Sequence, residues 1–191
     1  MNAREQILSV LRAQVVPAEP LPELEGPWIH YADRVAQFSL SVAQAAGNVV
    51  VVEPGGLARA VQQLPAVASA SVICSFTPEV AGTRTPPTEP HAYADVDVLI
   101  AAATFGVAET GAVWLAEQAT PVRSASFLAQ HLVVLLRASA LCDNMHDAYV
   151  RLGSELGRYG CFVAGPSKTA DIEQALVVGA HGPRSLSVLL Y

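Results

Sequence analysis

The chain has 191 residues, of which 52% are apolar and 15% are charged, and its net charge is −6. This length is sufficient for one domain with a buried core, and the acidic balance argues against a nucleic-acid partner, which favours a basic surface. The apolar stretch over residues 98–108 is shorter than the roughly 20 residues that a membrane span requires. We therefore expect no membrane span, and an α/β core whose strands are buried on both faces.

The first helix is predicted over residues 2–14, because Asn2 can cap it and Ile7, Leu8 and Leu11 form an apolar stripe. Residues 16–27 contain four prolines and three glutamates, a composition typical of an extended arm. We expect two units. Residues 1–27 form an N-terminal helix with a proline-rich arm, and residues 28–191 form an α/β domain.

Alternating apolar and turn-forming segments predict the remaining elements. Helices are expected at 28–46, 57–64, 124–130, 143–158 and 170–178, and strands at 48–52, 70–75, 96–103, 112–115, 132–136, 159–164 and 186–190. Residues 77–90 lack periodicity and predict a long loop. The alternation indicates a layered, mostly parallel sheet flanked by helices. Because no helix fits between 96–103 and 112–115, we expect these two strands to be adjacent.

The segment Gly165-Pro166-Ser167-Lys168-Thr169 follows a predicted strand and precedes a predicted helix. Such a turn would place free backbone N–H groups, two hydroxyls and an ammonium group at a helix N-terminus, an arrangement that binds anions. It would also lie at the carboxyl end of a strand, where open α/β sheets bind ligands. The alternative is an ordinary capped start of a helix.

Two other segments carry candidate functional side chains. Glu109 lies between Gly106 and Gly111 in an apolar connection, and could act as a general base or nucleophile or cap a turn. His181 lies between glycines, with Arg184 close behind it. It could contact an anion or carry a proton, or it could be an exposed loop histidine.

The three cysteines, Cys74, Cys142 and Cys161, are widely spaced and form no Cys-x-x-Cys pair. They predict reduced thiols in a cytoplasmic protein, and the mixed charge at the start of the chain argues against a secretory signal. Iron–sulfur clusters usually need four thiolates, so we expect no cluster on this chain alone. The histidines lack metal-ligand spacing. We predict neither a metal nor a cofactor on this chain.

Three motifs together resemble the lactate-utilisation protein C family, which carries the LUD domain. They are Val107–Gly111, Gly165–Gln174 and Gly179–Pro183, and the resemblance is close from about residue 96 onward. Glu109, Thr110 and Gly111 match the Glu-Thr-Gly of the family, and Lys168 stands where arginine is common. His131 matches a histidine at the start of a strand.

The resemblance implies a fold like that of ribose-phosphate isomerases, glucosamine-phosphate deaminases and CoA-transferases. It implies a role in bacterial oxidation of L-lactate to pyruvate beside iron–sulfur partner proteins, which are expected to carry the redox centres. We expect this chain to be a non-redox subunit that binds a small anionic ligand or organises those partners. The candidate catalytic residue is Glu109, and the candidate ligand-binding residues are Thr110, Gly111, Gly165, Ser167, Lys168, Thr169 and His181.

Two alternatives stay open at this point. The chain could be a stand-alone isomerase or transferase that acts on a phosphorylated sugar or an acyl-CoA, with Glu109 as base or nucleophile. It could also be a small-molecule binding module. A homo-oligomer stays open in each case.

Overall fold

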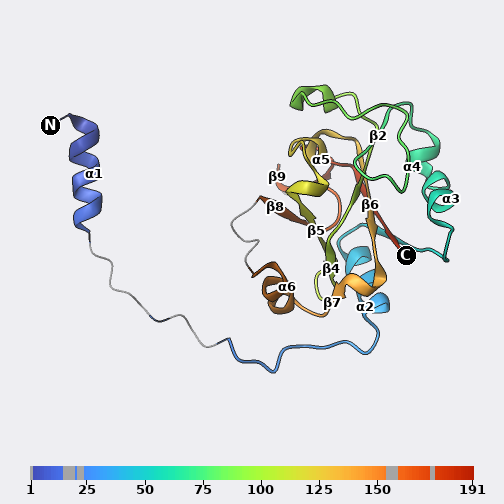
Figure 1. Ribbon diagram of the computed structural model, residues 1–191, viewed down its shortest axis with the longest axis horizontal. Coiled ribbons are helices and arrows are strands. Elements are labelled where there is room, and N and C mark those ends of the chain that lie inside the picture. Colours follow the sequence, from blue (N-terminus) through green and yellow to red (C-terminus); the bar gives the residue numbers. More distant parts are fainter. Residues whose placement is uncertain (1, 15–19, 21–23, 154–158, 173–174) are drawn as a thin grey trace.

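A computed structural model describes residues 2–14, 20, 24–153, 159–172 and 175–191 (Figure 1). Helix α1 (Ala3–Ala13) begins with the predicted capping box, in which Asn2 and Glu5 exchange hydrogen bonds, and it has no buried residue. It stands apart from the body of the protein (Figure 1). The boundary at residue 27 stays a prediction. Within the described residues, no helix is long and apolar enough to cross a membrane.

The centre of the body is a five-stranded sheet with the order β1-β11-β6-β3-β2, in which every pair is parallel. Its strands are β1 (Asn48–Val51), β2 (Ile73–Ser75), β3 (Val98–Ala102), β6 (His131–Leu136) and β11 (Ser185–Leu190). Strand β6 explains the continuous apolar runs: Leu132 and Val134 enter one core, whereas Val133 and Leu135 enter the other. Burial of both faces is confirmed.

Each face of this sheet is covered by a separate layer. Helices α3 (Leu57–Gln62) and α4 (Pro65–Ala68) pack on one face. Helix α2 (Arg34–Gln44) packs on the other face together with a second sheet of order β7-β4-β5-β8. The strands of that sheet are β4 (Phe105–Val107), β5 (Ala112–Ala116), β7 (Leu141–Cys142) and β8 (Gly160–Val163). The predicted α/β layered fold with a mostly parallel sheet is confirmed.

Helix α6 (Met145–Leu152) covers the outer face of the second sheet, where Trp114, Phe105 and Leu152 belong to a third buried cluster. The structure also contains α5 (Ala125–Leu128) and the short 3-10 helices η1 (Pro90–Tyr93), η2 (Glu117–Ala119) and η3 (Ala138–Ala140). The segment at 77–90 contains no regular element before η1, as predicted.

The expectation that the strands at 96–103 and 112–115 are adjacent is wrong. β3 lies between β2 and β6 in the central sheet, whereas β5 pairs antiparallel with β4, a strand that the periodicity did not reveal. The chain changes sheets at Thr104, whose N–H donates to the carbonyl oxygen of Trp114 at 3.0 Å. A three-residue strand is too short to show a period of two, which explains the omission.

The predicted helix at 28–46 begins later than expected. It starts at Arg34, with Asp33 accepting a hydrogen bond from the Ala36 N–H, and residues 28–33 are not helical. At its C-terminus, Ala46 adopts φ 63°, and the N–H of Gly47 donates to the Val42 carbonyl at 2.8 Å. The left-handed residue that ends this helix is therefore Ala46, in a Schellman turn.

Helix α6 begins at Met145 and not at Asp143, because Asn144 is the N-cap and accepts from the Asp147 N–H. The predicted end of this helix, at residues 154–158, lies outside the described residues.

The predicted helix at 170–178 is wrong. Strands β9 (Lys168–Ile172) and β10 (Ala175–Val178) form an antiparallel pair instead. The segment contains the β-branched residues Thr169, Ile172, Val177 and Val178, which favour strands. Without a helix, residues 165–169 form no helix N-terminus, and the anion cradle built on a helix dipole does not exist.

Candidate functional site

Two loops that the sequence analysis singled out enclose one pocket of about 250 Å³, here called the loop pocket. One loop carries Gly165, Pro166 and Ser167, and the other carries His181, Gly182 and Pro183. Two backbone hydrogen bonds join them: Ser167 N–H donates to Pro183 O at 2.9 Å, and Gly179 N–H donates to Ser167 O at 2.8 Å. Residues of the two motifs therefore lie together, and hydrogen bonds between two loops hold them there.

The walls of the loop pocket are mostly apolar. They come from α5, β8 and the first residues of β6 and β11, and they comprise Ser126, Phe127, Leu132, Cys161, Phe162, Val163, Ala164 and Leu186. The pocket lies at the amino ends of β6 and β11, since residues 179–184 lead into β11. Gly165 follows the carboxyl end of β8, as predicted, but β8 is antiparallel to β5 in the second sheet, so this turn does not lie at the carboxyl edge of the parallel sheet.

Three of the predicted ligand-binding residues line the loop pocket: Gly165, Ser167 and His181. A neighbouring hollow of about 460 Å³ shares His181 and Gly182 with it and adds Gln130 and Arg184. The exposed side chains of His181 and Arg184 therefore bring two candidate cationic groups to adjoining cavities.

Lys168 does not line the loop pocket. Its Nζ donates to the carbonyl oxygen of Ala45 at 2.5 Å, and Ala45 is the C-cap of α2. The C-terminus of a helix carries a partial negative charge that a cation stabilises. Lys168 therefore fastens β9 to α2. Thr169, the next residue of β9, also lies outside the pocket lining.

The Glu109-Thr110-Gly111 turn connects β4 with β5, and none of its residues lines the loop pocket. Glu109 Oε2 accepts from the N–H of Met145 at 3.0 Å, at the start of α6. Thr110 Oγ1 accepts from the N–H of Ala112 at 3.3 Å. The observed contacts of Glu109 and Thr110 are those of capping residues, and a catalytic role for Glu109 stays a prediction.

Gly111 and Gly165 lie against the same helix end. Gly111 has φ 68°, and a Cβ there would come within 2.6 Å of the Val42 nitrogen; Gly165 has φ 70°, and a Cβ there would come within 2.0 Å of the Ala45 oxygen. Val113 pairs with Val163 in the antiparallel β5–β8 pair. Two residues beyond that pair, the same register places Gly111 opposite Gly165. The two motifs are neighbours because both pack on the last turn of α2.

The contribution of α5 was not predicted from the sequence. Ser126 and Phe127 complete the loop pocket, and Phe127 remains 43% exposed beside it. Nothing in the local sequence distinguishes these side chains from those of any short surface helix. Only the packing of α5 beside the two loops reveals them.

His131 begins β6, and its Nδ1 lies 2.8 Å from Ser185 Oγ. Burial, and then the positive charge of Arg184, lower the pKa of the imidazole below its ordinary value. His131 lines two further hollows, one polar and one mostly apolar, that share no lining residue with the loop pocket. All three thiols are free, and burial raises the pKa of Cys142 and of Cys161.

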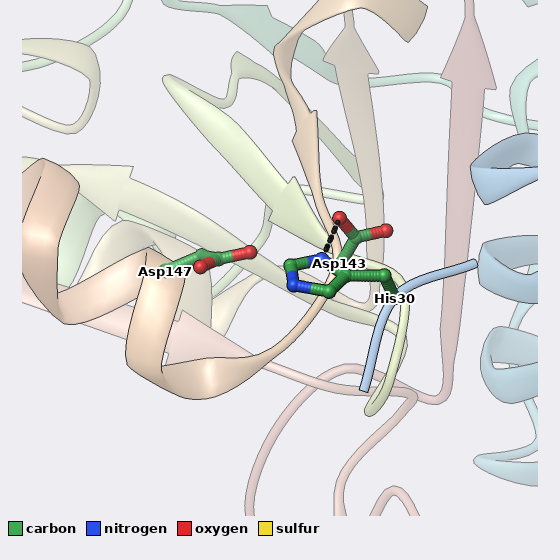
Figure 2. A group of neighbouring side chains, drawn as sticks. All are labelled: His30, Asp143 and Asp147. Atoms are coloured by element: carbon green, nitrogen blue, oxygen red, sulfur yellow. Dashed lines mark hydrogen bonds and ion pairs between the residues drawn. The ribbon is translucent and has the colours of Figure 1, made fainter. Parts of the chain in front are cut away.

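A second polar cluster joins the N-terminal segment to the start of α6 (Figure 2). Asp143, whose side chain is 1% exposed, accepts from Arg34 Nε and Nη2 at 2.9 and 2.7 Å. It also accepts from the Tyr31 N–H at 3.1 Å and lies 2.9 Å from His30 Nδ1. The Arg34 guanidinium, followed by the other hydrogen bonds, holds the pKa of Asp143 well below its usual range.

The segment 28–33, here called the N-terminal strap, has two further attachments. The Trp28 and His146 rings stack with their centroids 3.5 Å apart, and Asn144 Nδ2 donates to Ile29 O at 2.9 Å. These contacts explain why residues 28–33 are not part of α2: their polar groups are committed to the 143–146 turn.

His30, Asp143 and Asp147 place possible metal-ligand atoms within 4.8 Å of one another (Figure 2). The Asp143 carboxylate is, however, already neutralised by the bidentate Arg34. A cation would have to displace that guanidinium, so we interpret the cluster as the attachment of the N-terminal strap.

The model of the LUD domain matches residues 91–191, which is more than half of the chain. The chain belongs to the LUD domain family. The matched region contains both loops of the loop pocket, the Glu109-Thr110-Gly111 turn and His131.

Curated relatives agree with this assignment. Lactate utilization protein C of Shouchella clausii is 38% identical over 92 residues, covering 46% of this chain and 40% of that protein. Lactate utilization protein C of Halalkalibacterium halodurans is 36% identical over 93 residues, with the same two coverages, 46% and 40%. An uncharacterized protein of Neisseria meningitidis is 32% identical over 102 residues, covering 51% of this chain and 43% of that protein. The matches thus span less than half the length of these curated relatives.

Among solved structures, a DUF162 family protein from Deinococcus radiodurans superimposes with a TM-score of 0.64 at 16% sequence identity. The match covers 85% of this chain and 98% of that chain. At this identity the comparison supports the fold.

Proposed function

We propose that the chain acts in lactate utilisation, as a subunit without a redox centre of its own that supports oxidation of L-lactate to pyruvate by iron–sulfur partner proteins. The observation that carries the proposal is the LUD domain match over residues 91–191, with relatives named Lactate utilization protein C at 38% and 36% identity. The chain has three cysteines, fewer than the four thiolates usual for an iron–sulfur cluster. The proposal therefore assigns electron transfer to the partners.

Deletion of the gene that encodes this chain, in its own organism, tests the role in lactate utilisation. We expect the strain to lose growth on L-lactate as sole carbon source and to keep growth on pyruvate, because the block precedes pyruvate. Unimpaired growth on L-lactate would contradict the role in lactate utilisation. Separately, the purified chain should not reduce an artificial electron acceptor when L-lactate is supplied. Turnover by the chain alone would contradict the non-redox assignment.

For the anionic ligand, the proposal favours the loop pocket and a short carboxylate such as L-lactate or pyruvate. His181 and Ser167 offer polar groups at the wall, Arg184 lies in the adjoining hollow, and apolar walls suit a short hydrocarbon part. Lys168 was the cation favoured from the sequence, but its ammonium group donates a hydrogen bond to the carbonyl of Ala45. This arrangement supports His181 as the anion-contacting residue.

A pair of substitutions separates the roles of His181 and Lys168. His181→Gln should weaken L-lactate binding by about 10- to 100-fold, since a hydrogen bond to a charged group contributes roughly 1.5–3 kcal/mol. Lys168→Met should leave the affinity unchanged and lower the melting temperature slightly, because a cation at a helix C-terminus contributes about 0.3–1 kcal/mol. Isothermal titration calorimetry with L-lactate measures the affinity, and differential scanning calorimetry measures the melting temperature. Loss of binding in Lys168→Met with normal binding in His181→Gln would refute the loop-pocket assignment.

A further inference from the structure

The two edges of the five-stranded sheet differ in how the chain covers them. At the β2 edge, the N–H groups of Thr83 and Arg84 donate to the Ile73 carbonyl at 2.9 and 3.1 Å, and Thr83 Oγ1 accepts from the Ile73 N–H at 2.9 Å. At the opposite edge, β1 pairs with β11 and with no other strand among the described residues. One edge is therefore covered and the other is open.

The hydrogen-bonding groups on the open side of β1 can be assigned. Val52 N–H donates to Leu190 O at 2.7 Å, and main-chain groups alternate in direction along a strand. The groups of Val50 therefore also point toward β11, whereas those of Val49 and Val51 point away from the sheet. The side chain of Val51 is 64% exposed, which is consistent with an uncovered edge.

Edge strands of natural proteins are usually protected by charged residues or proline, because a bare edge is a template for another strand. The sequence of β1 is Asn-Val-Val-Val, without either. We infer that β1 pairs antiparallel with β1 of a second copy of this chain, about a two-fold axis at Val50. In this register Val49 of each copy exchanges both main-chain hydrogen bonds with Val51 of the other.

The pairing ends after these residues. The next pair in the register joins Gly47 to Glu53 of the second copy, but Gly47 N–H already donates to Val42 O at 2.8 Å and Glu53 O already accepts from Gly56 N–H at 2.9 Å. The covered β2 edge prevents continuation on the far side of each sheet. The contact is therefore isologous, and assembly stops at a dimer. A sheet with two uncovered edges would instead allow assembly to continue into a filament.

Cysteine cross-linking tests the register, in a Cys161→Ser background that removes the half-buried native thiol. At Val50 the two Cα atoms would form a non-hydrogen-bonded pair about 4.5 Å apart, within the range of a disulfide. Asn48→Cys is the matched control. In this register the two copies of residue 48 would lie four residues apart along the strands, about 13 Å, which is too far for a disulfide. We expect mild oxidation to give a covalent dimer with Val50→Cys, and monomers with Asn48→Cys and with the background protein.

Sedimentation velocity over a range of protein concentrations tests the dimer without a cross-link. Val51→Pro removes an N–H that points away from β11, and Val51→Lys adds charge to the exposed position; both should be monomeric with an unchanged circular dichroism spectrum. Val51→Thr keeps the N–H and the β-branched shape and should remain dimeric. A wild-type protein that stays monomeric at every concentration overturns the inference. So does a dimer that persists in Val51→Pro and Val51→Lys while Val50→Cys fails to cross-link.

Discussion

Substitution of Gly165 by alanine is expected to lower the free energy of unfolding by about 2–5 kcal/mol, since left-handed backbone costs a non-glycine residue about 1–2 kcal/mol and overpacking adds about 1–3 kcal/mol. Gly165 has φ 70°, and the new Cβ would lie 2.0 Å from the carbonyl oxygen of Ala45. That oxygen belongs to the backbone at the end of α2 and cannot rotate away. Urea denaturation followed by circular dichroism measures the change.

Gly55 provides the matched control. Its φ of 78° is also left-handed, but a Cβ there would meet no atom within 4 Å. Gly55→Ala should therefore cost only the backbone term, about 1–2 kcal/mol. Equal losses in the two variants would show that the approach of Gly165 to α2 does not matter. The expected difference instead identifies this glycine of the family motif as the close contact between the loop pocket and α2.

Replacement of Arg34 by methionine is expected to destabilise the protein by about 2–3 kcal/mol at neutral pH. Removing one partner of a buried pair costs about 3–5 kcal/mol, because the remaining charge is left uncompensated. Here Asp143 is 1% exposed, but Arg34 is 49% exposed, and the hydrogen bonds from His30 and Tyr31 remain. The cost should therefore fall below that range. Thermal and urea unfolding at pH 7 measure it.

The same substitution should change the dependence of stability on pH. The pKa of Asp143 is lower in the folded protein than its ordinary value, which is about 3.9 for an aspartate in an unfolded chain. The unfolded state therefore binds more protons in this range, and the stabilisation present above about pH 4–5 is lost as the pH falls toward the folded pKa. The difference between wild type and Arg34→Met should shrink as the pH falls from 5 to about 3.

Arg123→Met is the control for this experiment. Arg123 Nη2 lies 2.6 Å from Glu117 Oε1, but both side chains are exposed, by 57% and 40%. Surface pairs of this kind contribute about 0–1 kcal/mol. An Arg34→Met variant that loses no more stability than Arg123→Met, with a parallel pH profile, would show that Asp143 does not hold the N-terminal strap as the geometry indicates.

The sequence by itself was sufficient for the features that depend on near neighbours in the chain. The capping box of Asn2 and Glu5, the strands buried on both faces and the α/β alternation are encoded within a few residues of each other. The family membership also follows from local motifs, because the matched region at 91–191 contains all three segments that carried the resemblance.

Only the tertiary structure decided what the polar side chains of those motifs contact. Lys168 and Ala45 are 123 residues apart in sequence, and Glu109 and Met145 are 36 apart. The Lys168 ammonium group contacts a carbonyl at the end of a helix, and the Glu109 carboxylate contacts an N–H at the start of another. No local sequence pattern predicts such partners. The polar motif residues that line the loop pocket, Ser167 and His181, owe their proximity to two backbone hydrogen bonds between loops.

The choice between helix and strand at 168–178 was decided by pairing between two segments that follow each other in the chain. Apolar residues at 175, 176 and 178 fit a helical face, whereas the β-branched residues fit a strand, and intrinsic preferences of this size are weak. In the structure β9 pairs with β10, with Ile172 opposite Ala175 and Thr169 opposite Val177. Near-neighbour chemistry thus determined most of the elements and the family of this chain, and contacts between segments far apart in the sequence determined which side chains line the loop pocket.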